Sequence, residues 1–345
     1  MICNIDWLNV YCFERGVKDA AFFRLNSDYV VEPRDYGTRV FMEMFTLKDE
    51  RGRALIEIRR NPMSVGVLPR DACHIRLSNY MCYGRRPIDF LRDFLIRFDY
   101  TFQSIQKIDL CCDFNLFDSG LAPNIFVDHY ISGTFRKLYQ SRISAHGVNS
   151  VDGDLTFHSF SWGSKSSDIF TRFYCKSLEL DANKPYIWQM WRDNGIDVTL
   201  PVWRVEFSMS RGVQKLTDGE HAVQQTLTTY DTQSKIAAVF FGLASHYFRF
   251  KDSRTASRIY NAKDVRLFPN VSALSVERNI PDADDLPAKT IEGSFLGRAA
   301  QIWKTEGYDD VIRDLCGRIW ERAKHIDPRA GLLKRFTPEE RFTPD

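Results

Sequence analysis

Segments in which hydrophobic and polar residues alternate recur along the chain, and this pattern is typical of strands that bury one face. Up to residue 120, such segments predict strands at 4–14, 40–47, 54–59, 73–83 and 105–114. The turn sequence KDERG joins the second and third of them as a hairpin. After Pro87 the hydrophobic spacing changes to three and four residues, which predicts a helix that ends near Tyr100.

The same two patterns continue beyond residue 120. Alternation predicts further strands at 155–162, 169–178, 203–210 and 265–268. Helical spacing predicts helices at 123–131, 185–194 and 234–248. This running order of strands and helices favours an α+β fold, with a largely antiparallel central sheet and flanking helices.

The composition along the chain predicts three regions. Residues 1–270 form one catalytic domain of two strand–helix–strand halves, joined by a polar, Gly- and Ser-containing loop at 132–154. Residues 271–290 contain acids and prolines and are interpreted as a linker. Residues 291–345 are interpreted as a helical C-terminal segment with a frayed end.

Three of the predicted strands carry polar side chains on one face and hydrophobic side chains on the other. In KIDLCCDFN, Asp109 and Asp113 are four residues apart, so both point the same way. The strands in TRFYCKS and WRVEFSM repeat this arrangement with Arg172, Tyr174 and Lys176, and with Arg204, Glu206 and Ser208.

For each strand alone the simpler interpretation is a face wetted by solvent. Asp109 has a simple alternative too, as a salt-bridge partner of Lys107 or Arg204. Three such strands, each mixing acids or tyrosine with Arg or Lys, favour a functional site.

The residue types of these strands suit phosphoryl chemistry. Carboxylate oxygens are the ligands that Mg²⁺ and Mn²⁺ prefer, and Arg or Lys neutralises charge that develops on a phosphoryl group. A tyrosine acts as a covalent nucleophile when its neighbours favour the phenolate. This combination predicts an enzyme that nicks and rejoins a DNA strand.

The runs TRFYCKSLEL, KPYIWQMW and VWRVEFSMS resemble the replication initiators of rolling-circle plasmids and related mobile elements. The resemblance is to the Rep_trans group and to phage and plasmid replication proteins, including the filamentous-phage initiators. It extends to IDWLNVYCF, KIDLCCDFN and SRIYNAKDVRLF, and so touches most of residues 1–270. Its most specific part is Arg–x–Tyr–x–Lys–x–x–Glu, present as Arg172, Tyr174, Lys176 and Glu179.

The resemblance implies a role for each matching residue. Tyr174 would attack an origin phosphate, leaving a 5′-phosphotyrosine and a 3′-hydroxyl that primes synthesis, while Lys176 and Arg172 contact the scissile phosphate. A divalent ion, Mg²⁺ or Mn²⁺, would be held by Asp109, Asp113 and Glu206, with Glu179 as a further candidate. Further DNA contacts are assigned to Arg204, Arg258 and Lys263.

Two features mark alternatives. The seven histidines contain no HxH, so a histidine-based metal site is not expected. Tyr260 lies near Arg258 and Lys263 but lacks a glutamate at the spacing that follows Tyr174, and is interpreted as structural or as a DNA contact. A conjugative relaxase with the same chemistry, or a non-catalytic origin-binding protein of the same fold, would fit the sequence too.

Charge and cysteine usage complete these expectations. The net charge is only +2, so a coat that binds DNA regardless of sequence is not favoured. The eight cysteines form no CxxC pair, which favours reduced thiols in a cytoplasmic protein without a membrane span. The expected partner is DNA, both origin duplex and single strand, with a host helicase or a second copy as further candidates.

Overall fold

In the computed structural model, all the described residues belong to the unit Met1–Asn279. The residues that it describes are 1–64, 68–138, 143–149, 155–164, 167, 169–180, 184–210, 214–218, 221–269 and 275–278. The predicted helical segment 291–345 lies outside them. Of the predicted linker, only β16 (Ser275–Arg278) is described, and this strand pairs with β12 (Gln214–Asp218).

A ten-stranded sheet dominates the fold, in the order β2-β3-β4-β5-β1-β6-β11-β10-β9-β8. Every neighbouring pair in it is antiparallel. Its strands are β1 (Ile2–Glu14), β2 (Val30–Pro33), β3 (Phe41–Lys48), β4 (Ala54–Pro62), β5 (Ala72–Leu77), β6 (Tyr100–Phe114), β8 (Ile143–Asn149), β9 (Leu155–Trp162), β10 (Ile169–Cys175) and β11 (Trp203–Ser210). The predicted α+β class with a large antiparallel sheet is therefore confirmed.

Two small sheets accompany the large one. The first has the order β13-β12-β16 and the second the order β15-β14-β7. Their remaining strands are β7 (Phe135–Lys137), β13 (His221–Gln224), β14 (Phe250–Asp252) and β15 (Lys263–Asp264).

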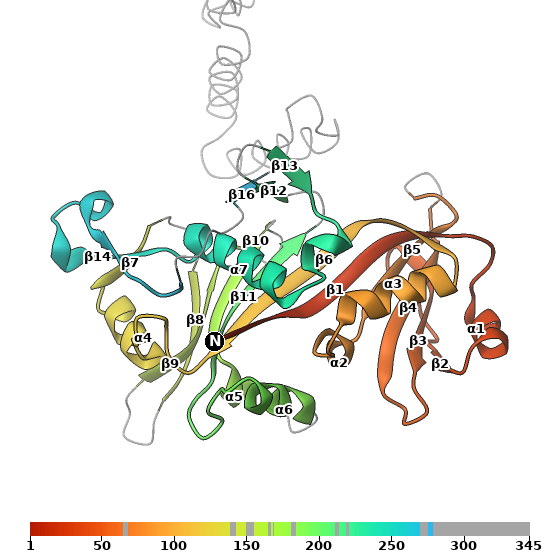
Figure 1. Cartoon of the computed structure of the whole chain (residues 1–345), viewed down its shortest axis with the longest axis horizontal. Helices are drawn as coiled ribbons and strands as arrows, with labels where there is room; N and C mark the ends of the chain where they lie inside the picture. The colour runs from red at the N-terminus through yellow and green to blue at the C-terminus, as the bar shows by residue number, and fades with distance from the viewer. Residues whose placement is uncertain are drawn as a thin grey trace, which may run out of the picture. The chain divides into compact units, whose positions relative to one another are not determined.

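The α-helices are short and pack on both faces of the large sheet. They are α1 (Ala20–Asn26), α2 (Asn79–Cys82), α3 (Pro87–Arg97), α4 (Pro123–Ile131), α5 (Lys176–Glu179), α6 (Pro185–Asp193) and α7 (Gln233–Tyr247). Three further single turns are 3-10 helices, at Leu227–Tyr230, Ser253–Thr255 and Ile259–Asn261. The helices α3 and α7 lie on one side of the sheet, as Figure 1 shows.

Hydrophobic side chains gather on the face that α3 and α7 cover. On β6 the alternate residues Ile108, Leu110, Cys112 and Phe114 are fully buried there, as the alternation predicts. The facing side chain of Phe240 on α7 is fully buried as well. The opposite face of β6 carries the polar residues, so one strand separates the core from the candidate site.

Several predicted boundaries are corrected by local chemistry. The strand predicted at 73–83 stops at Leu77, because the Ser78 side chain accepts a hydrogen bond from the backbone N–H of Met81 and caps α2. The strand predicted at 169–178 stops at Cys175, and α5 follows.

Other segments contain more structure than their polarity indicates. The predicted loop 132–154 contains β7 and β8, and the segment before β3 contains α1 and β2. The strand predicted at 265–268 is not regular structure, and the short β15 lies just before it. These strands pair at sheet edges or in small sheets, where a short polar segment needs no hydrophobic alternation.

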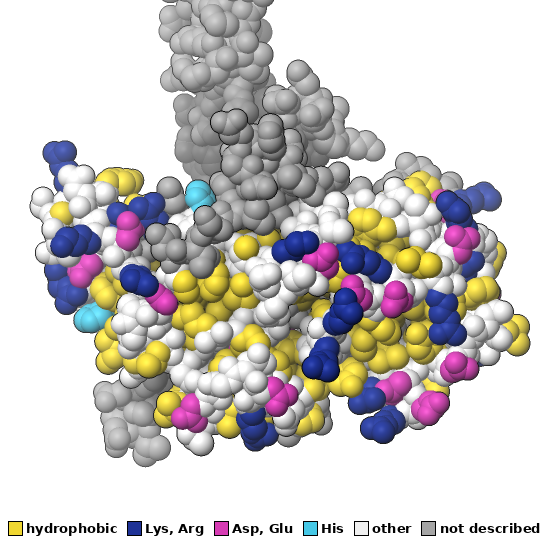
Figure 2. All heavy atoms as spheres, viewed as in Figure 1, with side chains coloured by type: hydrophobic (Ala, Val, Ile, Leu, Met, Phe, Trp, Pro, Cys, Tyr) yellow, Lys and Arg dark blue, Asp and Glu magenta, His cyan; other side chains and the backbone are white. Residues whose placement is uncertain are grey.

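The face seen in Figure 2 mixes charges of both signs. Basic and acidic side chains lie next to one another there, with hydrophobic surface between them. This mixture agrees with a net charge of only +2. None of the helices in the described part of the chain is long and apolar enough to cross a membrane.

The helix–sheet interface yields a stability prediction. Phe240 is fully buried against Phe207 and Phe268. Replacing it by alanine is expected to lower the free energy of unfolding by about 3–5 kcal/mol, because a buried ring is lost and a cavity remains. Leu25→Ala, on a side chain that is 84% exposed, should change it by no more than about 0.5 kcal/mol in the same urea titration. Equal effects of the two changes would contradict the packing described.

Candidate functional site

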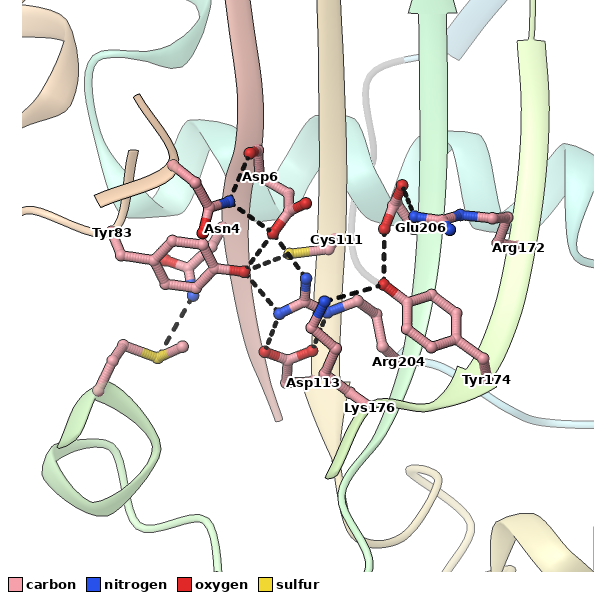
Figure 3. Close-up of polar contacts among 12 residues, drawn as sticks. Asn4, Asp6, Tyr83, Cys111, Asp113, Arg172, Tyr174, Lys176, Arg204 and Glu206 are labelled. Atoms are coloured by element: carbon pink, nitrogen blue, oxygen red, sulfur yellow. Dashed lines mark hydrogen bonds and ion pairs between the residues drawn. The ribbon is translucent and has the colours of Figure 1, made fainter. Parts of the chain in front are cut away.

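The three polar strands predicted from the sequence lie side by side as β6, β11 and β10. In the register of the sheet, Arg204 is opposite both Asp113 and Tyr174. Two residues further along β11, Glu206 is opposite Arg172 of β10. The sheet therefore assembles these side chains from distant segments onto one face, as Figure 3 shows.

The hydroxyl of Tyr174 is at the centre of a first cluster. It donates a hydrogen bond to Glu206 Oε2 at 2.8 Å and accepts one from Lys176 Nζ at 3.4 Å. The other carboxylate oxygen of Glu206 accepts a hydrogen bond from Arg172 at 2.6 Å. Burial, followed by the charge of Glu206, raises the pKa of Tyr174 well above its usual value. The hydroxyl is therefore protonated in the folded protein near neutral pH.

Lys176 reaches this cluster by a route that differs from the prediction. Alternation along one strand was expected to align it with Arg172 and Tyr174, but the strand ends at Cys175 and Lys176 begins α5. Its side chain nevertheless turns back and is buried beside Tyr174. Burial, followed by the charge of Arg204, lowers the pKa of Lys176.

A second cluster surrounds the guanidinium of Arg204, which is fully buried. It forms two hydrogen bonds to Asp113, at 2.5 and 2.7 Å. It donates further hydrogen bonds to Asp6 at 2.7 Å and to the Tyr83 hydroxyl at 2.6 Å. Burial, the largest single effect, opposes the charge of Arg204, but the attraction of Asp113 together with that of Cys111, Tyr83 and Tyr174 outweighs it, so the pKa of Arg204 is raised. Arg204, predicted as a DNA contact, is thus enclosed and held by four hydrogen bonds in this arrangement.

Local structure brings the partners of Arg204 into place. A β-bulge between Ile5 and Trp7 leaves Asp6 without a register partner on β6, and its side chain turns toward Arg204. Tyr83 follows directly after α2. Trp191 of α6 donates a hydrogen bond to Asp113 at 2.8 Å.

Three members of this cluster were not predicted as site residues. Asp6 stands in an otherwise strand-like segment, and its acid is the only sequence signal that could have marked it. Tyr83 ends the strand predicted at 73–83, and Trp191, in the helix predicted at 185–194, has the residue type of a core position. Trp191 is indeed fully buried, but its indole N–H binds an acid of the site as well.

Asp109 lies apart from both clusters, opposite Ser208 on β11. One of its oxygens binds Lys107 Nζ at 3.2 Å, the salt bridge weighed as an alternative from the sequence. Its other oxygen is buried and has no hydrogen-bond partner among the residues that the structure describes. Burial, helped by the nearby charge of Glu206, raises the pKa of Asp109 to about 6.

The four acids predicted to hold a metal ion do not converge. Asp113 and Glu206 have both oxygens engaged by the cationic or hydroxyl groups described above. Glu179 is exposed on α5, and Asp109 offers one oxygen. No group of three or more His, Cys, Asp or Glu side chains in the described part of the chain is placed to hold a metal ion. Mg²⁺ is commonly bound through only one or two carboxylates, with waters and phosphate oxygens completing its shell, and metal dependence stays a prediction.

The other predicted DNA contacts lie outside the clusters. Arg258 and Lys263 are both exposed and flank the 3-10 helix Ile259–Asn261, beside the small sheet of β7, β14 and β15. Tyr260 in the same segment is 76% exposed. Their exposure is compatible with contact to a phosphate backbone.

Comparisons with known proteins reveal a structural likeness. No family model matches the chain, and no curated protein matches it. Among solved structures, the rolling circle replication initiator protein from Geobacillus stearothermophilus is similar, at 12% identity and a TM-score of 0.46. The likeness covers 77% of this chain and 92% of that chain.

The chain is an α+β protein with a large antiparallel sheet. On one face of this sheet, a tyrosine, three carboxylates and three cations form two neighbouring clusters, with Lys176 of α5 as the one cation that does not come from a strand. Because Tyr174, Arg204 and Asp113 have no exposed surface, the interpretation as a face wetted by solvent is wrong for these residues.

Breaking the buried pair is expected to be costly. Arg204→Met leaves Asp113 and Asp6 buried without their cation, which should lower the free energy of unfolding by about 3–5 kcal/mol. Arg266→Met removes an arginine that is 69% exposed from its 2.6 Å pair with Asp118. This control should cost no more than about 1 kcal/mol. Comparable losses in chemical denaturation would contradict a special role for Arg204.

The raised pKa of Asp109 predicts a pH dependence of stability. The folded state keeps the proton up to about pH 6, whereas the unfolded state loses it near 3.8. The contribution of this carboxyl is therefore present at low pH and is lost as the pH rises between these values. Asp109→Asn should flatten the curve there and raise the free energy of unfolding at pH 7 by roughly 1–3 kcal/mol, at about 1.4 kcal/mol per pKa unit.

A carboxyl with the opposite shift supplies the control for Asp109. Hydrogen bonding to Arg249 lowers the pKa of Asp264, so its stabilisation is lost as the pH falls. Asp264→Asn should therefore flatten the acid side of the curve and give no gain at pH 7. A gain at pH 7 from Asp264→Asn, or none from Asp109→Asn, would argue against the assigned burial of Asp109.

Proposed function

We propose that this chain nicks and rejoins a DNA strand to start rolling-circle replication, with Tyr174 as the nucleophile. The observation that carries the proposal is the hydrogen bonding of the Tyr174 hydroxyl, which donates to Glu206 and accepts from Lys176. A general base and a cation thus contact the same phenolic oxygen. The motif that resembles rolling-circle initiators contributes Tyr174 and Lys176 to this arrangement.

The contacts define how the reaction would run. Tyr174 attacks the phosphorus as its proton passes to Glu206, and Lys176 and Arg172 stabilise the negative charge on the phosphoryl oxygens. The bond between phosphorus and the 3′ oxygen breaks, and the leaving oxygen takes up a proton from solvent water as a 3′-hydroxyl. The strand then stays on the enzyme as a 5′-phosphotyrosine, and the reverse steps rejoin it.

Access to Tyr174 sets a condition on this reaction. Its side chain has no exposed surface, and the charged groups of Arg172 and Lys176 lie 4.9 and 5.4 Å from its ring centre. Both are long, flexible side chains, and the side chain of Arg172 is 38% exposed. A DNA phosphate would compete with Glu206 for Arg172, and movement of Arg172 would uncover the hydroxyl.

The enclosure of Tyr174 favours a second candidate, an origin- or DNA-binding protein that does not cut. In that case the hydrogen bonds of Tyr174 and Glu206 serve stability alone. The raised pKa of Tyr174 agrees with this alternative, because a protonated phenol is a weak nucleophile.

Nicking of a supercoiled plasmid that carries the cognate origin separates the candidates. Tyr174→Phe is expected to lower the nicking rate by roughly 10³-fold or more and to keep DNA binding. Glu206→Gln, which cannot take the proton, should lower it by about 10²-fold. The rate is read from the conversion of supercoiled to open-circular DNA, and the covalent product from label transferred to the protein.

Two tyrosines serve as matched controls. Tyr186 donates a hydrogen bond to Asn79 at 2.7 Å and is not hydrogen-bonded to the carboxylate of Glu206, so Tyr186→Phe should nick normally. Tyr260→Phe tests the exposed rival. Normal nicking by Tyr174→Phe, or loss of nicking in Tyr260→Phe alone, would remove Tyr174 from the mechanism.

The same assay tests the two remaining points. If the wild type binds the origin and never cuts it, the non-catalytic candidate holds. The resemblance adds a dependence on Mg²⁺ or Mn²⁺, and this predicts that a chelator stops nicking and that added metal restores it. Nicking that persists in a chelator would contradict the metal requirement and leave the role of Tyr174 untouched.

A further inference from the structure

A pocket of about 400 Å³ opens on the polar side of the large sheet, away from Tyr174. Its lining comes from β1, β5, β6 and β11, from the start of β3 with the turn before it, and from β4. The residues are Asn9, Thr38, Arg39, Val40, Phe41, Arg59, His74, Gln106, Lys107 and Ser210. The volume is in the range of small-molecule sites.

The charged residues among the described lining of the pocket are all basic or histidine. Arg39, Arg59 and Lys107 line it, and none of the described lining residues is acidic. The carboxylates that pair with Arg59 and Lys107, Glu57 and Asp109, are not among those lining residues. Arg39 is exposed at the rim. The pocket therefore favours an anion.

Asn9 supplies a second and independent observation. Its side chain is only 8% exposed and lines the pocket, and among the described residues its Oδ1 atom has no hydrogen-bond partner. Oδ1 is covered as the side chain stands. Because a buried acceptor left unpaired costs free energy, a ligand that donates a hydrogen bond would favour a flip of the amide that turns Oδ1 toward the pocket. A phosphate alone, which mainly accepts hydrogen bonds, does not meet this need.

We propose that this pocket binds one nucleotide, with its phosphate on Arg39 and Lys107 and its base edge on the amide of Asn9. An Asn amide both donates and accepts, which is the pattern that pairs with the edge of a base. The phosphate then accounts for the basic lining of the pocket, and the base accounts for the unpaired oxygen of Asn9. The size of a nucleotide accounts for the volume of the pocket.

The nucleotide can come from a single strand of DNA or from a free nucleotide. The strand is favoured by position, because Lys107 and Ser210 are paired on β6 and β11, the same two strands that pair Asp113 with Arg204. Six residues separate these pairs on each strand, about 20 Å at roughly 3.3 Å per residue. The link from this pocket to Tyr174, unlike the pocket itself, rests on the proposed function.

Binding of a fluorescent single-stranded 12-mer, followed by anisotropy over a series of salt concentrations, tests the proposal. Arg39→Ala should weaken binding and reduce the slope of log K against log salt by about 0.7, the value for one phosphate contact on a single strand. Asn9→Ala should weaken binding roughly tenfold and leave this slope unchanged. Arg24→Ala, which removes an exposed arginine of α1 outside the pocket, should bind like the wild type.

Three further measurements make the outcomes decisive. Circular dichroism melting identifies any loss of folding in Asn9→Ala. Arg39→Ala changes an exposed position, so its result does not depend on whether Asn9→Ala folds. Calorimetric titration with dAMP shows whether a free nucleotide binds with the same dependence on Asn9. Binding of the 12-mer is measured without nicking, so failure of the nicking mechanism would leave its dependence on Arg39 and Asn9 in place, and the two failures remain distinguishable.

The two ligands and the variants distinguish the source of the nucleotide. Binding of both ligands with loss in Arg39→Ala and Asn9→Ala supports a nucleotide site open to either source, and binding of the 12-mer alone assigns it to the strand. Unchanged binding of both ligands by Arg39→Ala and folded Asn9→Ala overturns the proposal. An equal loss in Arg24→Ala overturns it as well, since the effect would then be one of net charge.

Discussion

The fully buried guanidinium of Arg204 is the constraint on which the site depends. Removing such a charge from water is unfavourable by several kcal/mol unless acids and hydrogen bonds compensate for it. Here Asp113, Asp6 and Tyr83 supply that compensation from β6, β1 and the end of α2. These segments must therefore meet around Arg204. Their contacts with it fix β6, β1 and the end of α2 relative to β11.

The charge balance of the site follows from this constraint. Arg204 and Lys176 are close to Asp6, whose pKa is lowered mainly by these two cations against the opposing effect of burial. Glu206 faces Arg172 and Tyr174. An approaching phosphate adds negative charge to a balanced cluster, and the partly exposed Arg172 is the cation best able to turn toward it. The proposed chemistry and the enclosure of Tyr174 are thus linked through one side chain.

How much of the fold follows from the sequence depends on the element. The bounds of α4, β9 and β11 are predicted to the residue, since alternation or helical spacing is strong there and Pro123 marks a helix start. The short edge strands β2, β7 and β8 are missed, because strands held by backbone pairing at an edge need little hydrophobic alternation. The end of β5 is missed because capping by Ser78 is a local hydrogen bond that a strand pattern does not reveal.

For the site, the sequence by itself determined which side chains of β6, β10 and β11 share a face, because the two-residue period of a strand leaves no other choice. Only the tertiary structure decided that β6, β11 and β10 are neighbours, that the bulge at Asp6 adds an acid from β1, and that α6 brings Trp191 over Asp113. It decided as well that Arg204 is a buried partner of acids and not an open cation. Strand order and burial arise from contacts between residues far apart in the chain, and a local pattern contains no information about them.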